Sequence, residues 1–264
     1  VFRKFFAEGA FSQAFIPIYS EYLGHKDEKG GQDFLNALFG LLLSVLFMFT
    51  ALALLFAPIF ILMFAPGFYF DSQKQELAVN LLRIMFPYLA LISLVAFAAG
   101  IQNSHNKFSI PAITPLIFNL SLIGSAWLVA PKIDIPVMAL AWGVLLAGFL
   151  QLLFQIAPLA SIKKIPIPKI DLKNSGVKKF FILILPAVIA GGIAQINLLI
   201  DTIFASLLIT GSPTWLYVSD RLIQFPMGIF AIAIGTVLLP SLSKAYAQQE
   251  THAFVSQLEH AFKL

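Results

Sequence analysis

Asp220 and Arg221 stand side by side in residues 215–239, a stretch that is otherwise apolar enough to span a membrane. An ionised side chain at bilayer depth costs roughly 2.5 to 3.5 kcal/mol even on lenient insertion scales, so it normally faces a partner or a water-filled cavity. Arg221 is therefore the first candidate for a site that handles a charged substrate inside the membrane. The alternative is a locally neutralised pair that only orients two helices.

A second polar group lies near the start of the chain. Lys4, Glu8 and Ser12 recur at four-residue spacing and so share one helical face, with Arg3 beside it. This face is too polar to contact lipid.

A third candidate is Asp201, a lone carboxylate in the apolar residues 180–208, four positions after Asn197. Polar uncharged residues in membrane helices usually form hydrogen bonds between helices. An isolated carboxylate there indicates a cation site, a proton relay or a structural ion pair, and the sequence leaves these open.

Composition decides which kind of fold must position these residues. The chain is 59% hydrophobic and 11% charged, with 27 Phe and a mean hydropathy of +0.88. Soluble domains average about 45 to 50% apolar and about 25% charged residues. The sequence therefore predicts an all-α membrane protein, a polytopic helical bundle. Because there is no cysteine, disulfides and thiolate metal sites are excluded.

Apolar runs near or above about 20 residues, the length that crosses about 30 Å of hydrocarbon, predict six complete spans. They are residues 34–64, 77–101, 110–130, 135–160, 180–208 and 215–239. Residues 1–22 resemble the end of an earlier span, and residues 252–264 the entry to a later one. This pattern predicts a segment of a longer protein.

The lysines predict the orientation, because short cytoplasmic loops carry an excess of positive charge. The loops at 21–33, 102–109 and 161–179, together with the tail after residue 241, form one side. They hold Lys26, Lys29, Lys107, Lys163, Lys164, Lys169, Lys173, Lys178, Lys179, Lys244 and Lys263, whereas the opposite loops hold only Lys74 and Lys132. The lysine-rich side is predicted to be cytoplasmic. The net charge of +4 then needs no nucleic-acid surface to explain it.

Residues 161–179 form the longest polar connection. Two prolines prevent a continuous helix there, and the lysines can lie against anionic lipid heads at about 1 kcal/mol each. We interpret this segment as a basic cytoplasmic linker between an N-terminal lobe, residues 1–160, and the beginning of a C-terminal lobe, residues 180–264.

No catalytic triad, phosphate-binding loop or metal motif appears in the sequence, which argues against a hydrolase or an ATP-driven pump. The four histidines lie in predicted loops or at helix ends, where solvated surface is the default expectation. We expect no enzyme activity and no cofactor.

Four motifs closely resemble the MurJ/MviN family of lipid II flippases. They read FFAEGAFSQAFIP at 5–17, NKFSIPA at 106–112, SDRLIQFP at 219–226 and GTVLLPSLSK at 235–244. The resemblance runs over the whole chain. It implies a two-lobed transporter of the multidrug/oligosaccharidyl-lipid/polysaccharide (MOP) exporter superfamily in the bacterial inner membrane, here covering the second span to the start of the ninth.

The resemblance also implies roles for single residues. Arg3, Lys4, Glu8 and the pair Asp220 and Arg221 fall on positions of the family's substrate cavity. Lys4 stands where relatives often carry Arg, so the charge is kept but the bidentate geometry is lost. Asp201 resembles an acidic position that contributes to a sodium site in some members, so coupling to a monovalent cation is implied.

The implied substrate is the undecaprenyl-diphosphate-linked peptidoglycan precursor, moved from the cytoplasmic to the periplasmic leaflet by alternating access. Membrane lipids and proteins of cell-wall synthesis are the implied partners. The rivals are a cation-coupled drug or other polyprenyl-oligosaccharide exporter of the same superfamily, and a membrane scaffold that does not transport. A drug exporter favours an acidic cavity, and a scaffold predicts charges that pair off fully.

Overall fold

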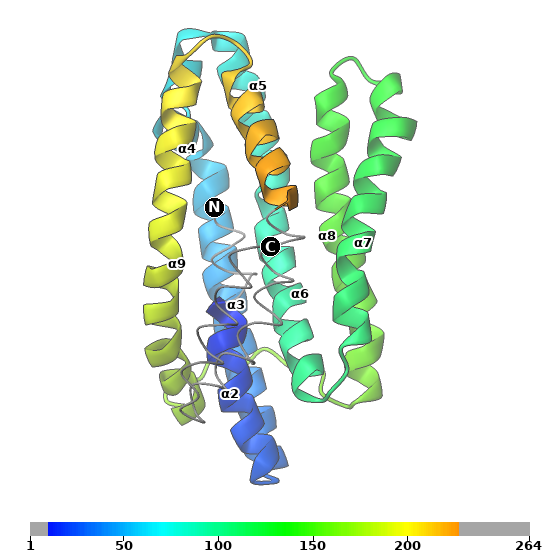
Figure 1. The fold of residues 1–264 in the computed structure, drawn as a ribbon. Helices are drawn as coiled ribbons and strands as arrows, with labels where there is room; N and C mark the ends of the chain where they lie inside the picture. Colours follow the sequence, from blue (N-terminus) through cyan, green and yellow to red (C-terminus); the bar gives the residue numbers. More distant parts are fainter. Residues whose placement is uncertain (1–9, 227–264) are drawn as a thin grey trace, which may run out of the picture. The chain divides into compact units, whose positions relative to one another are not determined.

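The computed structural model describes residues 10–226, without the side chains of residues 10, 190, 191, 193 and 194. The chain divides into two compact units, residues 1–207 and residues 208–264. Every regular element of the described residues is helical (Figure 1). The first unit contains α2 Ala10–Gly24, α3 Glu28–Leu55, α4 Ala57–Phe64, η1 Pro66–Phe70, α5 Ser72–Met85, α6 Pro87–Ser104, α7 Ser109–Gly124, η2 Ser125–Val129, η3 Ala130–Lys132, α8 Pro136–Ser161 and α9 Ser175–Leu207. The described part of the second unit contains a helix over residues 212–226.

Four helical stretches of the described residues are long and apolar enough to cross a membrane. They are Glu28–Leu55, Ser72–Ser104, Ser109–Lys132 and Pro136–Ser161, and they match the first four predicted spans. Helix α9 has 33 residues, about 50 Å at about 1.5 Å per residue, which exceeds the hydrocarbon thickness. The predicted span 215–239 runs beyond the described residues. The predicted fold class is confirmed: the protein is an all-α, multi-pass membrane protein.

Prolines break two of the predicted spans. The run 34–64 is divided between α3 and α4 at Phe56, with Pro58 in the first turn of α4. The run 77–101 is divided between α5 and α6 in front of Pro87. Proline lacks the N–H that an interior helical position donates but suits the first turn, so each helix restarts there.

An aromatic core joins α2, α3 and α6. The ring of Phe15, fully buried on α2, lies 5.9 Å from Phe34 of α3 and 5.5 Å from Phe97 of α6. Gly100 permits this approach, because a Cβ atom built on it would come within 2.9 Å of the Phe15 ring. Such ring pairs contribute about 0.5 to 1.5 kcal/mol beyond the area they bury.

The loops that join α2 to α3, α6 to α7 and α8 to α9 meet at one end of the first unit, the lower end in Figure 1. The hydroxyl of Tyr19 lies 3.1 Å from Nε2 of His105, and Glu21 forms an ion pair with Lys179. The three loops predicted to share one side of the membrane therefore do lie together, and we call this the basic end.

Three helices finish at the basic end with the same backbone turn. Residues Lys26, Asn106 and Lys163 have φ angles of 56°, 57° and 54°, just after α2, α6 and α8. The next amide bonds back to the helix in each case, for example Lys107 N to Gln102 O and Lys164 N to Leu159 O. This is the Schellman cap, which satisfies the last helical carbonyls.

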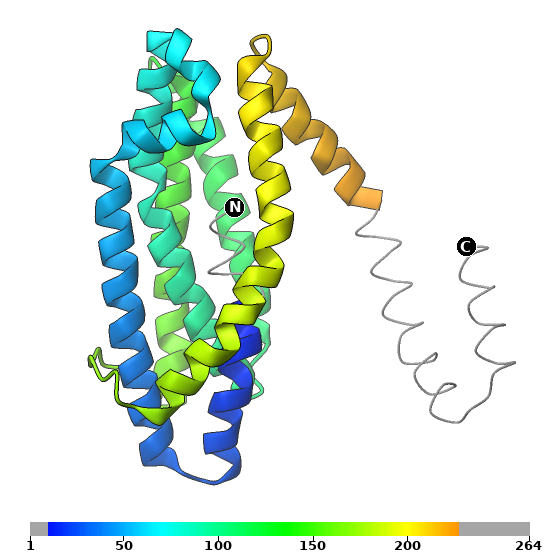
Figure 2. The same cartoon turned by 90° about the vertical axis from the view of Figure 1, so that its left-hand side faces the viewer.

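The linker is fastened to α3. The Oδ1 atom of Asn36 accepts from Ile167 N at 2.8 Å, and the carbonyl of Asn36 accepts from Lys169 N at 3.1 Å. A Cβ atom on Gly40 would come within 2.4 Å of the Lys169 carbonyl, so only glycine lets the linker lie this close. Figure 2 shows the linker against α3 before it joins α9.

Helix α9 lies along α2 within the first compact unit (Figures 1 and 2). Ring contact between Phe11 and Phe180, at 5.4 Å, and the Glu21–Lys179 ion pair join the two helices. The division into lobes 1–160 and 180–264 stays a prediction.

Candidate functional site

Of the predicted substrate-binding residues, Arg3, Lys4 and Glu8 lie outside the described residues. Asp220 and Arg221 lie on the helix of residues 212–226 in the second unit, and both are at least partly exposed there. Of the predicted substrate-binding residues, the structure therefore describes only the pair Asp220 and Arg221.

Arg221 is held by side chains one helical turn away. Its guanidinium carbon lies 5.2 Å from the ring centre of Tyr217, and its Nε donates to the Tyr217 hydroxyl at 3.2 Å. A terminal nitrogen donates to Oε1 of Gln224 at 3.4 Å. Arginine has five N–H donors, so these two bonds leave three for a ligand.

Asp220 and Arg221 form no ion pair with each other among the described contacts, because neighbouring positions on a helix point in different directions. Instead, Gln224 connects them: it accepts from Arg221 and donates to Oδ2 of Asp220 at 2.6 Å. The arginine is thus positioned without being neutralised at close range. Tyr217 and Gln224 were not among the predicted site residues, although their spacing of four and three from Arg221 is a helical signal.

Asp201 lies on α9 with an exposed side chain, and no described residue forms a hydrogen bond or ion pair with it. The same part of α9 packs against the rest of the first unit through buried Gln195 and Ser206, and Ser206 Oγ accepts from Gly67 N at 3.1 Å. Asn197 is exposed together with Asp201. The carboxylate therefore lies on a face of α9 that the described part of the first unit leaves uncovered.

The contact between α2 and α9 at the basic end includes a pocket of about 470 Å³ whose lining mixes apolar and charged side chains. Glu21, His25, Asp27 and Lys179 are among the residues that line it. The hydrogen bond and charge of Lys179 lower the pKa of Glu21, which favours the ionised carboxylate that the ion pair requires. Both side chains are about half exposed, at 52% and 51%, so water reaches the pair.

A buried polar network, which we had not predicted, joins α6, α7 and α8. Gln102 Nε2 donates to Gln155 Oε1, Gln155 Nε2 donates to Thr114 Oγ1 at 2.7 Å, and Thr114 Oγ1 donates to Ile110 O at 2.8 Å. Gln102 and Gln155 are both 0% exposed. The sequence predicts a loop over residues 102–109, but α6 continues to Ser104 and places Gln102 on the helix.

No group of three or more His, Asp or Glu side chains in the described part of the chain is placed to hold a metal ion. The described polar groups instead suit binding of a charged ligand by Arg221 and interactions between helices. Neither arrangement contains a nucleophile paired with a base.

Comparison with known proteins decides the family. The family model of lipid II flippase MurJ matches residues 1–264. The chain belongs to this family. "Lipid II flippase MurJ" of Burkholderia cenocepacia is 36% identical, over 99% of this chain and 52% of that protein. "Probable lipid II flippase MurJ" of Haemophilus influenzae is 40% identical, over 94% of this chain and 50% of that protein.

A solved structure of lipid II flippase MurJ in an inward closed conformation matches with a TM-score of 0.78 and 30% identity. The match covers 99% of this chain and 52% of that one. The chain spans about half the length of the MurJ relatives it matches. These relatives are named as flippases, which are transporters and not enzymes.

Proposed function

We propose that this MurJ-family protein moves an undecaprenyl-diphosphate-linked peptidoglycan precursor, lipid II, from the cytoplasmic to the periplasmic leaflet of a bacterial inner membrane. The observation that carries the proposal is the family match over all 264 residues. We assign no chemical catalysis to the protein, in keeping with its relatives' names.

The chemistry of the substrate fits the described arginine. A diphosphate presents several charged oxygens, and the planar guanidinium fork matches them better than an ammonium group does. Arg221 keeps three N–H donors for this purpose, and Tyr217 fixes its direction. Arg3 and Lys4 would supply further positive charge, while Glu8 and Asp220 would limit the cost of holding that charge within the membrane.

The basic end is proposed to face the cytoplasm, because the three lysine-rich loops meet there and the positive-inside bias applies to short loops. The substrate would then enter from this end. In alternating access, contacts that close one end must separate to open it. We propose that this separation occurs at the contact between α2 and α9, which the half-exposed ion pair of Glu21 and Lys179 helps to close.

Asp201 is proposed to take part in coupling to a monovalent cation such as sodium. Its carboxylate is exposed on α9, and no described side chain neutralises it. A carboxylate within a membrane helix needs a partner, and a bound cation is one way to provide it. Asn197, exposed on the same stretch of α9, is a neighbouring source of oxygen.

Complementation tests the function. The full-length gene that contains this sequence is expressed in bacteria depleted of their own lipid II flippase, and growth and lipid II translocation are measured. We expect both to be restored. Normal membrane expression without rescue would contradict the proposal and favour a different exporter of the superfamily, which a drug-efflux assay on the same cells would detect.

A matched pair of variants separates transport from scaffolding. Arg221→Ala removes the proposed phosphate contact, whereas Lys132→Ala removes a lysine at the opposite end of the first unit. If the protein only scaffolds other components, both variants should rescue growth equally. A specific loss with Arg221→Ala, at equal expression, supports transport.

A further inference from the structure

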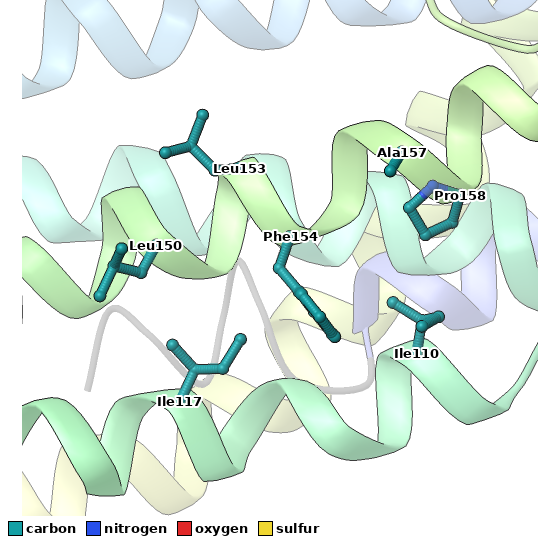
Figure 3. A pocket seen from close by; sticks show the side chains of 7 residues that line it. All are labelled: Ile110, Ile117, Leu150, Leu153, Phe154, Ala157 and Pro158. Atoms are coloured by element: carbon teal, nitrogen blue, oxygen red, sulfur yellow. The ribbon is translucent and has the colours of Figure 1, made fainter.

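An apolar groove lies between α7 and α8 on the outside of the first unit. It has a volume of about 580 Å³, and all of its lining side chains are apolar. Figure 3 shows the ring of Phe154 reaching from α8 toward α7, at a level between Ile110 and Ile117. Leu153 is 61% exposed and Leu150 is 41% exposed, so the groove is open to the surroundings of the bundle.

The groove is shorter than the hydrocarbon thickness of one lipid leaflet and fits within it. From Ile110 to Ile117, α7 rises about 10 Å at about 1.5 Å per residue. Half of the hydrocarbon core is about 15 Å thick. Both helices are long and apolar enough to cross the membrane, and the wholly apolar lining of the groove suits acyl chains better than water.

Lysines stand at one end of this groove. Lys107 precedes Ile110 by three residues, and Lys163 and Lys164 follow Pro158, which also lines the groove. The Schellman caps fix the backbone of both loops: Lys107 N bonds to Gln102 O, and Lys164 N bonds to Leu159 O. The two loops lie near each other, because Gln102, five residues before Lys107, donates a hydrogen bond to Gln155 of α8, nine residues before Lys164.

We infer that this groove is a binding site for an anionic phospholipid of the leaflet at the basic end. One acyl chain lies along Phe154 between Ile110 and Ile117, and the phosphate lies beside Lys107 and Lys164. Charge complementarity selects the headgroup, because basic side chains at the ends of membrane helices attract anionic lipid heads. The apolar lining selects the chain. The site lies on the outer surface and does not depend on which substrate the protein moves.

Binding of single lipids to the purified full-length protein, measured by native mass spectrometry in detergent, tests the inference. The probes are phosphatidylglycerol and phosphatidylcholine with identical palmitoyl and oleoyl chains. We expect one phosphatidylglycerol to bind more tightly than phosphatidylcholine. The double variant Lys107→Gln/Lys164→Gln should lower the affinity for phosphatidylglycerol by about 25-fold, about fivefold per lysine. Its affinity for phosphatidylcholine should be unchanged. Lys132→Gln, at the opposite end, is the control.

A second pair of variants tests the groove itself. Ala157 lines the groove, so Ala157→Phe should fill it and lower the affinity for both lipids by at least fivefold. Ala112 is an exposed alanine of α7 outside the lining, and Ala112→Phe should have no effect. Thermal unfolding of each variant checks that it is folded. Equal affinity of the two lipids for the unmodified protein would overturn the inference, as would equal weakening by both phenylalanine variants.

Discussion

The buried glutamine network offers the sharpest test of what holds α6, α7 and α8 together. Replacing Gln155 by Leu removes two hydrogen bonds, one from Gln102 and one to Thr114. Thr114 keeps its bond to the Ile110 carbonyl, but the buried amide of Gln102 loses its described partner. Hydrogen bonds between membrane helices average about 0.6 kcal/mol, and an unsatisfied buried polar group costs about 1 to 3 kcal/mol. We expect Gln155→Leu to lower the free energy of unfolding by about 1 to 3 kcal/mol.

The double variant Gln102→Leu/Gln155→Leu should be more stable than Gln155→Leu alone. It removes the orphaned amide and leaves only the lost bond to Thr114, so its expected cost is about 0.6 to 1 kcal/mol. The two substitutions are therefore expected to be non-additive by at least about 1 kcal/mol, the signature of a direct contact.

The assay is equilibrium unfolding in mixed micelles with increasing denaturing detergent. Gln151→Leu, one turn away on α8, is the matched control. Gln151 donates a single hydrogen bond to the Thr114 carbonyl, and its Oε1 atom has no described partner. Its replacement therefore loses one hydrogen bond but also removes an unsatisfied acceptor. Additive effects of the substitutions at Gln102 and Gln155 would refute the network as a stabilising unit.

Four further outcomes follow from the site and the loops. Arg221→Lys should retain part of the flipping activity and Arg221→Ala little, and a stably inserted Arg221→Ala protein with the normal rate would remove this residue from the mechanism. Asp201→Asn should abolish the dependence of transport on the ion gradient, and an unchanged ion response would make the residue structural. A cysteine placed at Lys163 should react with an impermeant thiol reagent only from the cytoplasmic side, because the chain has no other cysteine; periplasmic labelling would reverse the topology. Burial first, and then Lys164, lowers the pKa of His105 below 6.5, so the unfolded chain binds a proton that the folded chain resists. The free energy of unfolding should therefore fall as the pH drops below about 6.5, and an acid titration of His105→Gln should show a flatter dependence.

The sequence predicted the fold class well because hydropathy and span length are properties of single segments. It also grouped the basic loops correctly, since lysine counts need no knowledge of packing. It predicted 34–64 as one span, whereas Pro58 starts a new helix after Phe56. A proline near the end of a long apolar run indicated this break, but run length alone does not show where a helix restarts.

The candidate site was predictable only where charge itself was the signal. Arg221 and Asp220 stand out because charged residues are rare in membrane helices. Tyr217 and Gln224 accept hydrogen bonds from Arg221 because they lie about one helical turn from it. This relation becomes evident once the helix is known. Gln102 and Gln155 are 53 positions apart and meet only through the packing of α6 on α8. Pairings of this kind depend on tertiary structure, and a single sequence holds no local sign of them.

Two lysines of the basic end, Lys26 and Lys163, both add positive charge to a loop and occupy the cap of a helix. A helix C-terminus carries partial negative charge from its free carbonyls, so a cation there is favourable by about 0.3 to 1 kcal/mol. Lys26 and Lys163 occupy the left-handed position of the cap, where glycine is usual, and so accept a backbone cost of about 1 kcal/mol. A glycine would remove that cost, but it would also remove a positive charge that the proposed cytoplasmic orientation of the loop favours. The proposed cytoplasmic orientation of the basic end is therefore a reason for lysine at these two caps despite the backbone cost of the turn.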